Sequence, residues 1–341
     1  MRHVGRMTGL AAAVALAGAG SAFAQAEHTL RIQTHYAPET PSGKLAQQFF
    51  DDVETMSGGR IDIEPFFSSS VVKSVETFDA AATGILDCDM TGGAYQTGKN
   101  PAFQFVGDVM GGYDTPWQYY AWFYHGGGKE AAEELYHNFN MHPVGWWIYG
   151  QEALASTTPL PGIDSIKDWK FRSPPGLETE IFAALGASPV VMDFTEVFTA
   201  LETGIIDGAD ASGLANNVGL GLYDIAGHAT YPGFHSMPAD HLACRMDAWE
   251  ALPEDLKRIM EVAMEKLAFQ TAMTFEVLNN EAAVALAEKG ITLHEWSQED
   301  RDAFRKASQE QWQNWAEKTP EARKLVDSHL AFMKNLGLVA E

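Results

Sequence analysis

The chain has 341 residues, 46% of them apolar, and its 46 acidic and 23 basic side chains give a formal net charge of −23. This length and composition suit a globular protein of two domains. So acidic a surface repels nucleic-acid phosphates and anionic lipid headgroups, so we expect no nucleic-acid partner and no binding to a membrane surface.

The first 24 residues have the pattern of a bacterial signal peptide. Arg2 and Arg6 precede an apolar run at 10–17, and Ala22 and Ala24 are small residues at the positions that a signal peptidase reads. The apolar run is too short for a spanning helix. We therefore predict a periplasmic protein whose mature part begins near Gln25.

Strands and helices alternate along the chain in the order typical of parallel sheets. We expect strands at 28–34, 60–67 and 86–91 with helices at 43–56 and 71–83, and then strands at 144–149, 153–157, 169–172, 189–192 and 206–209 with helices at 178–185 and 196–203. The fold class is thus α/β, with two lobes of the periplasmic binding protein type. We assign 1–24 to the signal peptide, 25–142 together with part of the C-terminal region to lobe I, 143–250 to lobe II and 251–341 to a helical C-terminal region.

The helical region begins at Pro253, where apolar residues start to recur at helical spacing and continue to Gly290. This predicts one helix of more than thirty residues, which either bridges the two lobes or packs on a second subunit. Ser297, with Asp300 three residues later, indicates the start of another helix, and Pro320 the start of a last one.

Cys88 and Cys244 are the only cysteines, and both lie in apolar stretches that suit small buried residues. An oxidising compartment permits a disulfide between them. The sequence alone does not bring the two together, so we expect two unpaired core cysteines.

Two short motifs suggest other chemistry. Ser70 and Lys73 match the S-x-x-K of periplasmic serine acyl-enzymes, but the partner motifs S-D-N and K-T-G do not occur downstream. We interpret this match as a helix start with an exposed lysine. His235, Asp240 and His241 carry zinc-binding side chains but lack H-E-x-x-H spacing, so a loop histidine that hydrogen-bonds a ligand, or one that is simply solvated, is favoured over zinc.

Arg172 closes a short strand and is followed by Ser-Pro-Pro-Gly at 173–176, which cannot continue a regular element. An arginine at the carboxyl end of a strand, in the mouth between two lobes, fits a carboxylate in bidentate geometry. Taken alone, a surface arginine in a salt bridge is the better interpretation. The wider pattern of motifs favours the carboxylate site.

Short motifs along nearly the whole mature chain are shared, in the same order, with one family. They are Met56-Ser57-Gly58-Gly59-Arg60, Tyr95 with Gly98-Lys99, Trp169-Lys170-Phe171-Arg172, Leu185-Gly186-Ala187-Ser188-Pro189-Val190, Ala200-Leu201-Glu202-Thr203-Gly204, Ile206-Asp207-Gly208 and Asp247-Ala248-Trp249-Glu250-Ala251-Leu252-Pro253. The chain resembles the periplasmic solute-binding proteins of TRAP transporters, of the DctP type. Residues 121–128 and 231–233 are similar to the branch that binds 2-oxo acids and lactate.

This resemblance implies two lobes that close over a small carboxylate, with Arg172 as the carboxylate clamp and with Gln151 and Tyr95 facing the solute. In the 2-oxo acid branch a metal ion is held beside the ligand carboxylate by a glutamine, a backbone carbonyl and acidic side chains. Carried over to this chain, the resemblance implies that Gln151 and Asp210 hold Na⁺ or Ca²⁺.

The chain departs from that branch at two places. Ala211 replaces an expected tryptophan, and His235-Ser236 stands where a second acidic ligand is expected. Asp210 and Asn217 then offer hydrogen bonds to solute hydroxyl groups, and His235 offers one to a second polar group. Because Ala211 leaves more room than tryptophan, we expect a carboxylate bulkier than pyruvate, unless Phe234 or Trp146 fills the space.

We therefore predict an extracytoplasmic binding protein, and no enzyme, that delivers a small organic anion to TRAP membrane permease subunits. A serine hydrolase that uses Ser70 and Lys73 is one alternative. A sensory binding protein of the same fold is another. We also expect a homodimer through the long helix, as the resemblance to the 2-oxo acid branch implies.

Overall fold

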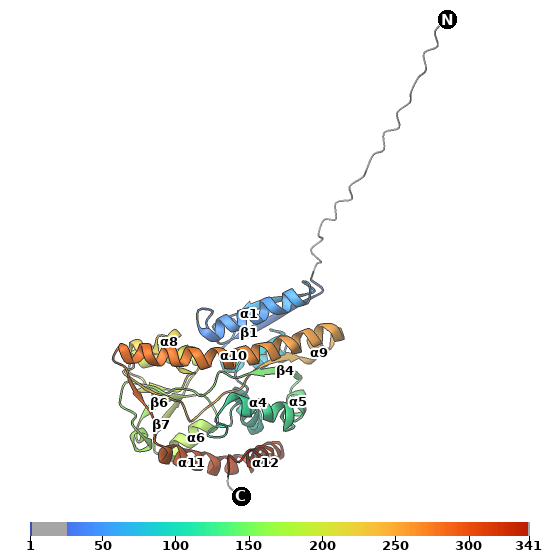
Figure 1. Cartoon of the computed structure of the whole chain (residues 1–341). Coiled ribbons are helices and arrows are strands. Elements are labelled where there is room, and N and C mark those ends of the chain that lie inside the picture. The colour runs from blue at the N-terminus through green and yellow to red at the C-terminus, as the bar shows by residue number, and fades with distance from the viewer. Residues whose placement is uncertain (2–25, 340–341) are drawn as a thin grey trace.

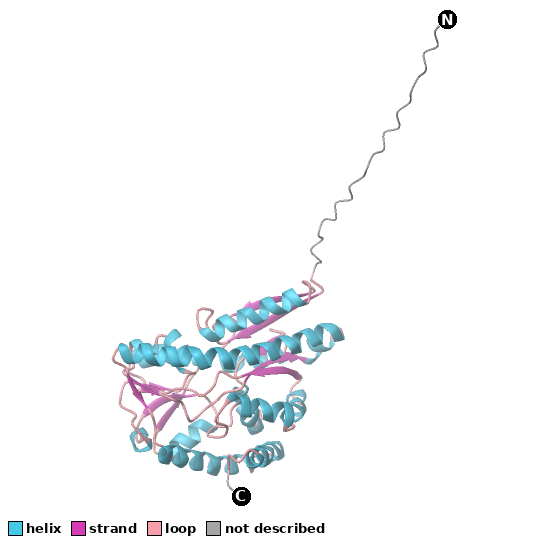
Figure 2. Cartoon of the chain, viewed as in Figure 1, coloured by secondary structure: helices cyan, strands magenta, loops and turns pink. Residues whose placement is uncertain are grey.

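The computed structural model describes Met1 and residues 26–339 (Figure 1). The predicted signal peptide, apart from Met1, lies outside the described residues. No helix in the described part of the chain is long and apolar enough to cross a membrane. Two β-sheets lie side by side with helices around them, and one long helix passes both (Figure 2).

The first sheet has the strand order β2-β1-β3-β10-β4. Its strands are β1 (His28–Thr34), β2 (Ile61–Phe66), β3 (Cys88–Met90), β4 (Met141–Trp147) and β10 (Asp240–Arg245). Strand β1 is parallel to β2 and β3, whereas β10 is antiparallel to β3 and β4. The range expected for lobe II contains β10 and most of β4, yet both strands belong to this sheet, because hydrophobic periodicity does not specify which strands pair.

The second sheet has the order β11-β9-β5-β8-β6-β7. Its strands are β5 (Ala155–Ser156), β6 (Lys170–Ser173), β7 (Ser188–Val191), β8 (Gly208–Ala209), β9 (His228–Thr230) and β11 (Thr292–His294). Strand β6 is parallel to both β7 and β8. The carboxyl ends of these three strands therefore meet at one edge of the sheet, which is where ligands bind in open α/β sheets.

Helices and short 3₁₀ turns connect and cover the sheets. The α-helices are α1 (Pro41–Met56), α2 (Thr77–Ala82), α3 (Gln104–Gly107), α4 (Pro116–His125), α5 (Gly128–His137), α6 (Leu177–Ala184), α7 (Val197–Glu202), α8 (Leu214–Gly219), α9 (Met246–Glu250), α10 (Glu254–Glu288), α11 (Gln298–Ala316) and α12 (Pro320–Asn335). The 3₁₀ turns are η1 (Ser74–Glu76), η2 (Gly93–Gly98), η3 (Pro101–Phe103), η4 (Ile163–Ile166), η5 (Phe194–Glu196) and η6 (Leu222–Asp224).

The long helix α10 confirms the prediction of a helix after Pro253 that bridges the lobes. It packs on α1 and β4 of the first lobe and on α8 and β11 of the second, and Figure 1 shows it crossing both. Its buried face carries Leu256, Met260, Leu267 and Phe275, among other apolar residues. Burial of this stripe against both lobes stabilises a helix too long for propensity alone to explain.

The helix expected at 71–83 is shorter than predicted and begins at η1 and α2. The side-chain oxygen of Gln33, on β1, accepts the backbone N–H of Val71 at 2.8 Å and that of Val72 at 3.3 Å. These tertiary hydrogen bonds hold the backbone N–H groups in an irregular segment. Ser70 and Lys73 consequently do not share a helical turn, which the S-x-x-K interpretation requires.

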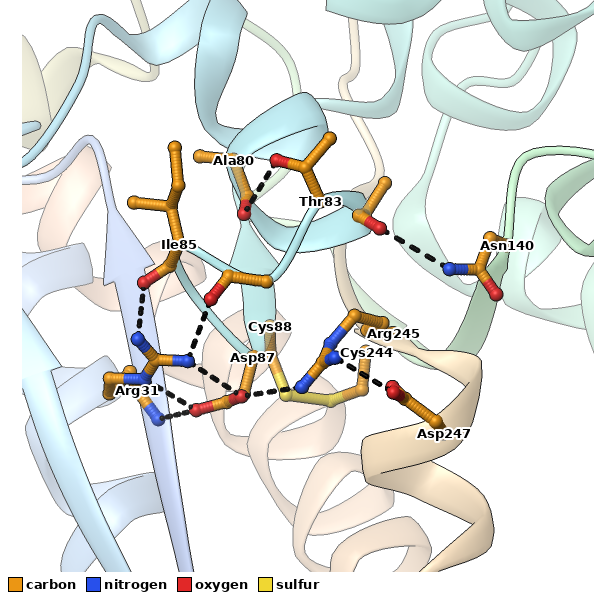
Figure 3. A network of polar contacts seen from close by, with 12 residues as sticks. Arg31, Ala80, Thr83, Ile85, Asp87, Cys88, Asn140, Cys244, Arg245 and Asp247 are labelled. Atoms are coloured by element: carbon orange, nitrogen blue, oxygen red, sulfur yellow. Dashed lines mark hydrogen bonds and ion pairs between the residues drawn. A yellow bond between two sulfur atoms is a disulfide. The ribbon is translucent and has the colours of Figure 1, made fainter.

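Cys88 and Cys244 form a disulfide, so the prediction of two unpaired cysteines is wrong. The two residues are opposite each other on β3 and β10, strands that lie far apart in sequence and pair only in the folded sheet. Figure 3 shows Asp87 beside this bridge, where it accepts hydrogen bonds from Arg31 and Arg245. The disulfide and the ion pairs therefore fasten β1, β3 and β10 to one another.

Candidate functional site

Arg172 lies on β6, at the edge where the three parallel strands end, and is 2% exposed. Its Nη1 donates to the carbonyl of Asp210 at 2.7 Å, and its Nε donates to the carbonyl of Met192 at 3.3 Å. The third nitrogen, Nη2, is buried and has no hydrogen-bond partner among residues 26–339. The backbone thus fixes two sides of the guanidinium group and leaves the third for another group.

Side chains of both lobes surround this guanidinium group. Phe194, which follows β7, places its ring centroid 5.9 Å from Cζ of Arg172, and Tyr95 of the first lobe lies beside the guanidinium group. His35, directly after β1, packs its ring 4.8 Å from Phe194 and 5.9 Å from Tyr95. The guanidinium group of Arg172 therefore lies between the two lobes, while the solute-binding roles of Arg172 and Tyr95 stay predictions.

Two polar contacts close the mouth of this site. Nζ of Lys73 lies 3.0 Å from Oε1 of Glu196, and Oγ of Ser74 lies 3.2 Å from Oδ1 of Asp193. Lys73 and Ser74 belong to the first lobe, and Asp193 and Glu196 to the second. The two lobes are thus in contact across the cleft, and Lys73 pairs with an acidic residue there and not with Ser70.

Four buried carboxyl groups lie behind Arg172: Asp108, Glu152, Glu178 and Asp210. Oγ of Ser236 lies 2.7 Å from Oδ2 of Asp108 and 2.7 Å from Oε2 of Glu152. A hydroxyl group has one hydrogen to donate, so one of these two carboxyl groups must carry a proton.

The directions of the pKa shifts agree with a proton on Asp108 or Glu152. Burial raises the pKa of Asp108 to about 7. It also raises the pKa values of Glu152 and Glu178 well above their usual range, and the neighbouring Asp210 adds to both shifts. Burial alone would raise the pKa of Asp210 as well, but His235, Glu152 and Arg172 together more than offset it and the net pKa is lowered. Asp210 is therefore the member of the group that stays ionised.

Glu152, Asp210 and His235 place one potential metal-binding atom each within 4.8 Å of one another. Nε2 of His235 is 3.0 Å from Oδ1 of Asp210, and its Nδ1 has no partner in the described part of the chain. The zinc triad weighed from sequence does not assemble, because His241 pairs with Asp89 and Asp240 accepts from Tyr36 elsewhere.

The other predicted site residues are distributed around this cluster. Gln151 donates to the carbonyl of Tyr113 at 2.9 Å and lines a hollow of about 650 Å³ beside α10, which Arg172 does not line. Asn217 donates to the backbone carbonyls of Ala153 and Ser212, and Ala211 is 6% exposed next to Asp210. Their roles as solute or metal contacts stay predictions.

Five residues of the site lie outside the sequence motifs: His35, Asp108, Glu152, Glu178 and Asp193. His35 and Asp193 come shortly after the parallel strands β1 and β7, and this position is the signal that could have found them. Folding brings Glu152 and Glu178 close to Asp210, and no local sequence pattern predicts this proximity.

The sequence profile of the family described as "Bacterial extracellular solute-binding protein, family 7", DctP, matches residues 32–319. The chain belongs to this family. It is 30% identical, over 294 residues, to a monocarboxylate 2-oxoacid-binding periplasmic protein of Nostoc sp., a match that covers 83% of this chain and 78% of that protein.

Two solved structures extend this likeness. An open, ligand-free TRAP periplasmic solute-binding protein of Rhodobacter sphaeroides has 34% identity and a TM-score of 0.73, and the match covers 92% of this chain and all of that one. A TRAP periplasmic solute-binding protein of Pseudoalteromonas atlantica with bound sodium and pyruvate has 26% identity and a TM-score of 0.81, over 91% and 95%. The chain thus has the two-lobe fold of the TRAP periplasmic solute-binding proteins.

Proposed function

We propose that the protein captures a small organic monocarboxylate in the periplasm and delivers it to the membrane subunits of a TRAP transporter. One observation carries this proposal. Nη2 of Arg172 is buried between the lobes without a partner among residues 26–339. An unpaired buried donor is unfavourable, and a carboxylate is the group that best matches a free guanidinium edge.

The preference for a monocarboxylate rests on the charges around Arg172. Asp210 and Asp193 are acidic groups on the same side of the cleft, and the pKa of each lies below its usual value, although burial opposes the shift in both. A second carboxylate on the solute would face these groups at short range. The likeness to a relative that binds monocarboxylate 2-oxo acids supports the same choice.

We propose that Glu152, Asp210 and His235 hold a cation when one is bound beside the solute. The trio fits such an ion, because Asp210 is ionised and the carboxyl oxygens of Asp210 and Glu152 are ligands that suit Na⁺ and Ca²⁺. The cation would supply positive charge next to the solute carboxylate. Gln151 lies outside this trio and remains a predicted ligand.

The periplasmic location is supported by the pattern of residues 1–24 and by the Cys88–Cys244 disulfide, which needs an oxidising compartment. A homodimer through α10 is part of the proposal. The outer face of that helix exposes Phe269, Met273 and Val277, apolar side chains that a second copy would bury.

The proposal is tested by replacing Arg172 with alanine and measuring binding of pyruvate and lactate by calorimetry. Removing one partner of a buried charge pair costs about 2–5 kcal/mol, so we expect affinity to fall roughly thirtyfold to several thousandfold for both acids. Arg172→Lys should recover part of the loss, because lysine keeps the charge without the fork.

Arg31→Ala is the matched control, since the partly exposed Arg31 has its own carboxylate partner, Asp87, and also donates to the carbonyls of Ile85 and Gly84. It should leave both affinities unchanged. Thermal melting checks that both proteins are folded. If folded wild type and folded Arg172→Ala bound the acids equally, Arg172 would not be the carboxylate clamp.

A further inference from the structure

The hollow of about 650 Å³ beside α10 lies where the chain passes from one lobe to the other. Residues 148–154 lead from β4 in the first sheet to β5 in the second, and residues 231–239 lead back from β9 to β10. Both crossings line the hollow, at 149–151 and 231–234, together with residues of α10, α11 and the start of α4. We call this space the hinge hollow. Its volume is in the range of small-molecule sites.

The two crossings are fastened to each other and to α10, so the wall of the hinge hollow is already formed. The backbone N–H of Glu152 donates to the carbonyl of Ser236 at 2.9 Å. Gly233 permits this close approach, since a Cβ there would meet the carbonyl oxygen of Glu152 at 2.1 Å. The Tyr231 hydroxyl donates to Oδ1 of Asn280, on α10, at 3.0 Å. A site with a preformed wall loses little free energy to reorganisation when it binds a ligand.

Two side chains that line the hinge hollow have buried polar atoms without partners. They are Nε of Arg301, on α11, and Oε1 of Gln151, in the described part of the chain. Arg301 also forms no ion pair there, whereas Arg305, one turn further along α11, pairs with Asp114. Unpaired buried polar atoms are unfavourable, so a ligand that pairs with Arg301 would recover free energy.

The rest of the lining indicates the chemistry of that ligand. Trp117, Phe234 and Phe275 supply aromatic surface. Glu276 and Asp302 are acidic, but both are exposed, and water and salt screen exposed charges. The guanidinium group of Arg301 is half-buried, and an arginine fork matches a carboxylate better than it matches a neutral group.

We propose that the hinge hollow is a second binding site, which takes a small organic anion with an aromatic or apolar body. The anionic group pairs with Arg301, and the body packs on the aromatic wall. The inference does not depend on the proposed function, because Arg172 does not line the hollow. Of Phe269, Met273 and Val277 on the outer face of α10, only Met273 lines it, so the site lies beside the predicted dimer face and not on it.

The test uses 2-naphthoate, an aromatic carboxylate, as the probe, and calorimetry on the full mature chain. We expect 2-naphthoate to bind. Naphthalene-2-carboxamide, which has the same body without the charge, should bind at least roughly tenfold more weakly, the ratio expected for the loss of one charge-assisted hydrogen bond. No binding of 2-naphthoate, or equal binding of the amide, would overturn the inference.

Arg301→Gln removes the charge from the hinge hollow. It should weaken 2-naphthoate binding by roughly tenfold to a hundredfold. The variant should fold, since Arg301 has no ion pair to lose in residues 26–339. Trp117→Ala, at an exposed position of the aromatic wall, should also weaken binding. Unchanged affinity in both folded variants would overturn the assignment.

Lys306→Gln is the matched control for Arg301→Gln. It makes the same change of charge on the same helix, at an exposed residue that does not line the hinge hollow. The affinity for 2-naphthoate should stay as in wild type. If Lys306→Gln and Arg301→Gln weakened binding equally, the effect would come from the net charge of the protein, and the site at Arg301 would be wrong.

Arg172→Ala separates the hinge hollow from the cleft between the lobes. We expect this variant to bind 2-naphthoate as tightly as wild type does. Loss of 2-naphthoate binding in Arg172→Ala would place the probe in the cleft and overturn the inference. Failure of the proposed function gives a different result, because it leaves the affinities for pyruvate and lactate unchanged in the same variant.

Discussion

Two buried aspartate–histidine pairs, one in each lobe, have nearly the same geometry and different surroundings. Nε2 of His241 lies 2.9 Å from Oδ2 of Asp89 in the first lobe, and Nε2 of His235 lies 3.0 Å from Oδ1 of Asp210 in the second. All four side chains are at most 2% exposed. The residue types and distances alone do not distinguish the pairs.

The partners of the remaining polar atoms do distinguish them. In the first lobe Thr91 donates to Asp89 at 2.7 Å, and the Tyr136 hydroxyl lies 2.8 Å from Nδ1 of His241. Gly93 leaves room for this arrangement, since a Cβ there would meet the Tyr136 hydroxyl at 2.9 Å. The pair in the first lobe is complete.

In the second lobe Nδ1 of His235, Oε1 of Glu178 and Nη2 of Arg172 are without partners between residues 26 and 339. Leaving such atoms unpaired costs free energy in the unliganded protein, which a bound solute or cation recovers. The comparison teaches that satisfaction of hydrogen bonds, more than residue type, separates a structural network from a binding site in this molecule.

The largest expected effect comes from His241→Ala. It leaves the Asp89 carboxylate buried with Thr91 as its remaining side-chain partner, so we expect the free energy of unfolding to fall by about 3–5 kcal/mol. Solute affinity of the folded fraction should not change. Urea unfolding and calorimetry measure the two quantities.

The matched variant is His235→Ala, which removes the same ring from the incomplete pair. We expect a smaller loss of stability and a clear loss of solute affinity, the reverse of the His241→Ala result. If both variants lost the same stability and neither changed affinity, the distinction between the two pairs would fail.

The disulfide offers the second test, because it joins the strands that carry Asp89 and His241. Replacing Cys88 and Cys244 together by alanine should lower the free energy of unfolding by about 2–4 kcal/mol, since the unfolded chain gains freedom. Solute affinity should stay as in wild type. If neither the substitutions nor a reducing agent changed the melting temperature, the hydrogen bonds around Asp89 and His241 would hold β3 and β10 together without the disulfide.

Much of the fold could be predicted because its signals are local. The alternating residues of β1 and the apolar stripe of α10 act within one element, and both elements appear where the sequence predicts them. Pairing between strands is not local, which is why β4 and β10 joined the first sheet and Cys88 met Cys244. The helix expected at 71–83 is shorter because the backbone N–H groups of Val71 and Val72 donate to the side chain of Gln33, about forty positions away.

The site divides in the same way. Arg172 could be found because a strand end and a following Ser-Pro-Pro-Gly turn mark it in the sequence. The acidic residues Glu152 and Glu178 gain their meaning from Asp210, which lies on another strand end. Sequence reasoning therefore singles out Arg172, the predicted carboxylate clamp, and misses the buried acidic residues near it.

The third test extends the comparison to another complete histidine site, far from the cleft. His329 on α12 has Nδ1 2.9 Å from the Tyr113 hydroxyl and Nε2 2.6 Å from the carbonyl of Phe105, and its ring stacks on Trp122 at 3.8 Å. Burial lowers the pKa of His329 to about 3, and the Phe105 carbonyl offsets part of that shift. The native protein therefore keeps this ring neutral at pH values where an exposed histidine is charged.

The sign of the effect follows from proton binding. Between about pH 6.5 and pH 3 the unfolded chain binds a proton at His329 that the native protein does not bind, so the free energy of unfolding falls as the pH falls, by up to about 1.4 kcal/mol per pH unit. His35, whose pKa burial also lowers to about 3, contributes in the same direction. Both residues thus contribute to the change of the wild-type free energy of unfolding between pH 6.5 and pH 5. His329→Gln should make this pH dependence shallower, because it removes the contribution of His329.

Lactate or pyruvate affinity, measured over the same pH range, should follow the same curve in wild type and in His329→Gln, because the partners of His329 are complete without a solute. His35→Phe should alter that curve, since His35 faces the cleft. An unchanged stability slope in His329→Gln would mean that this ring is protonated in the native state. It would also show that a complete set of hydrogen-bond partners is not enough to identify a buried histidine of this protein as structural.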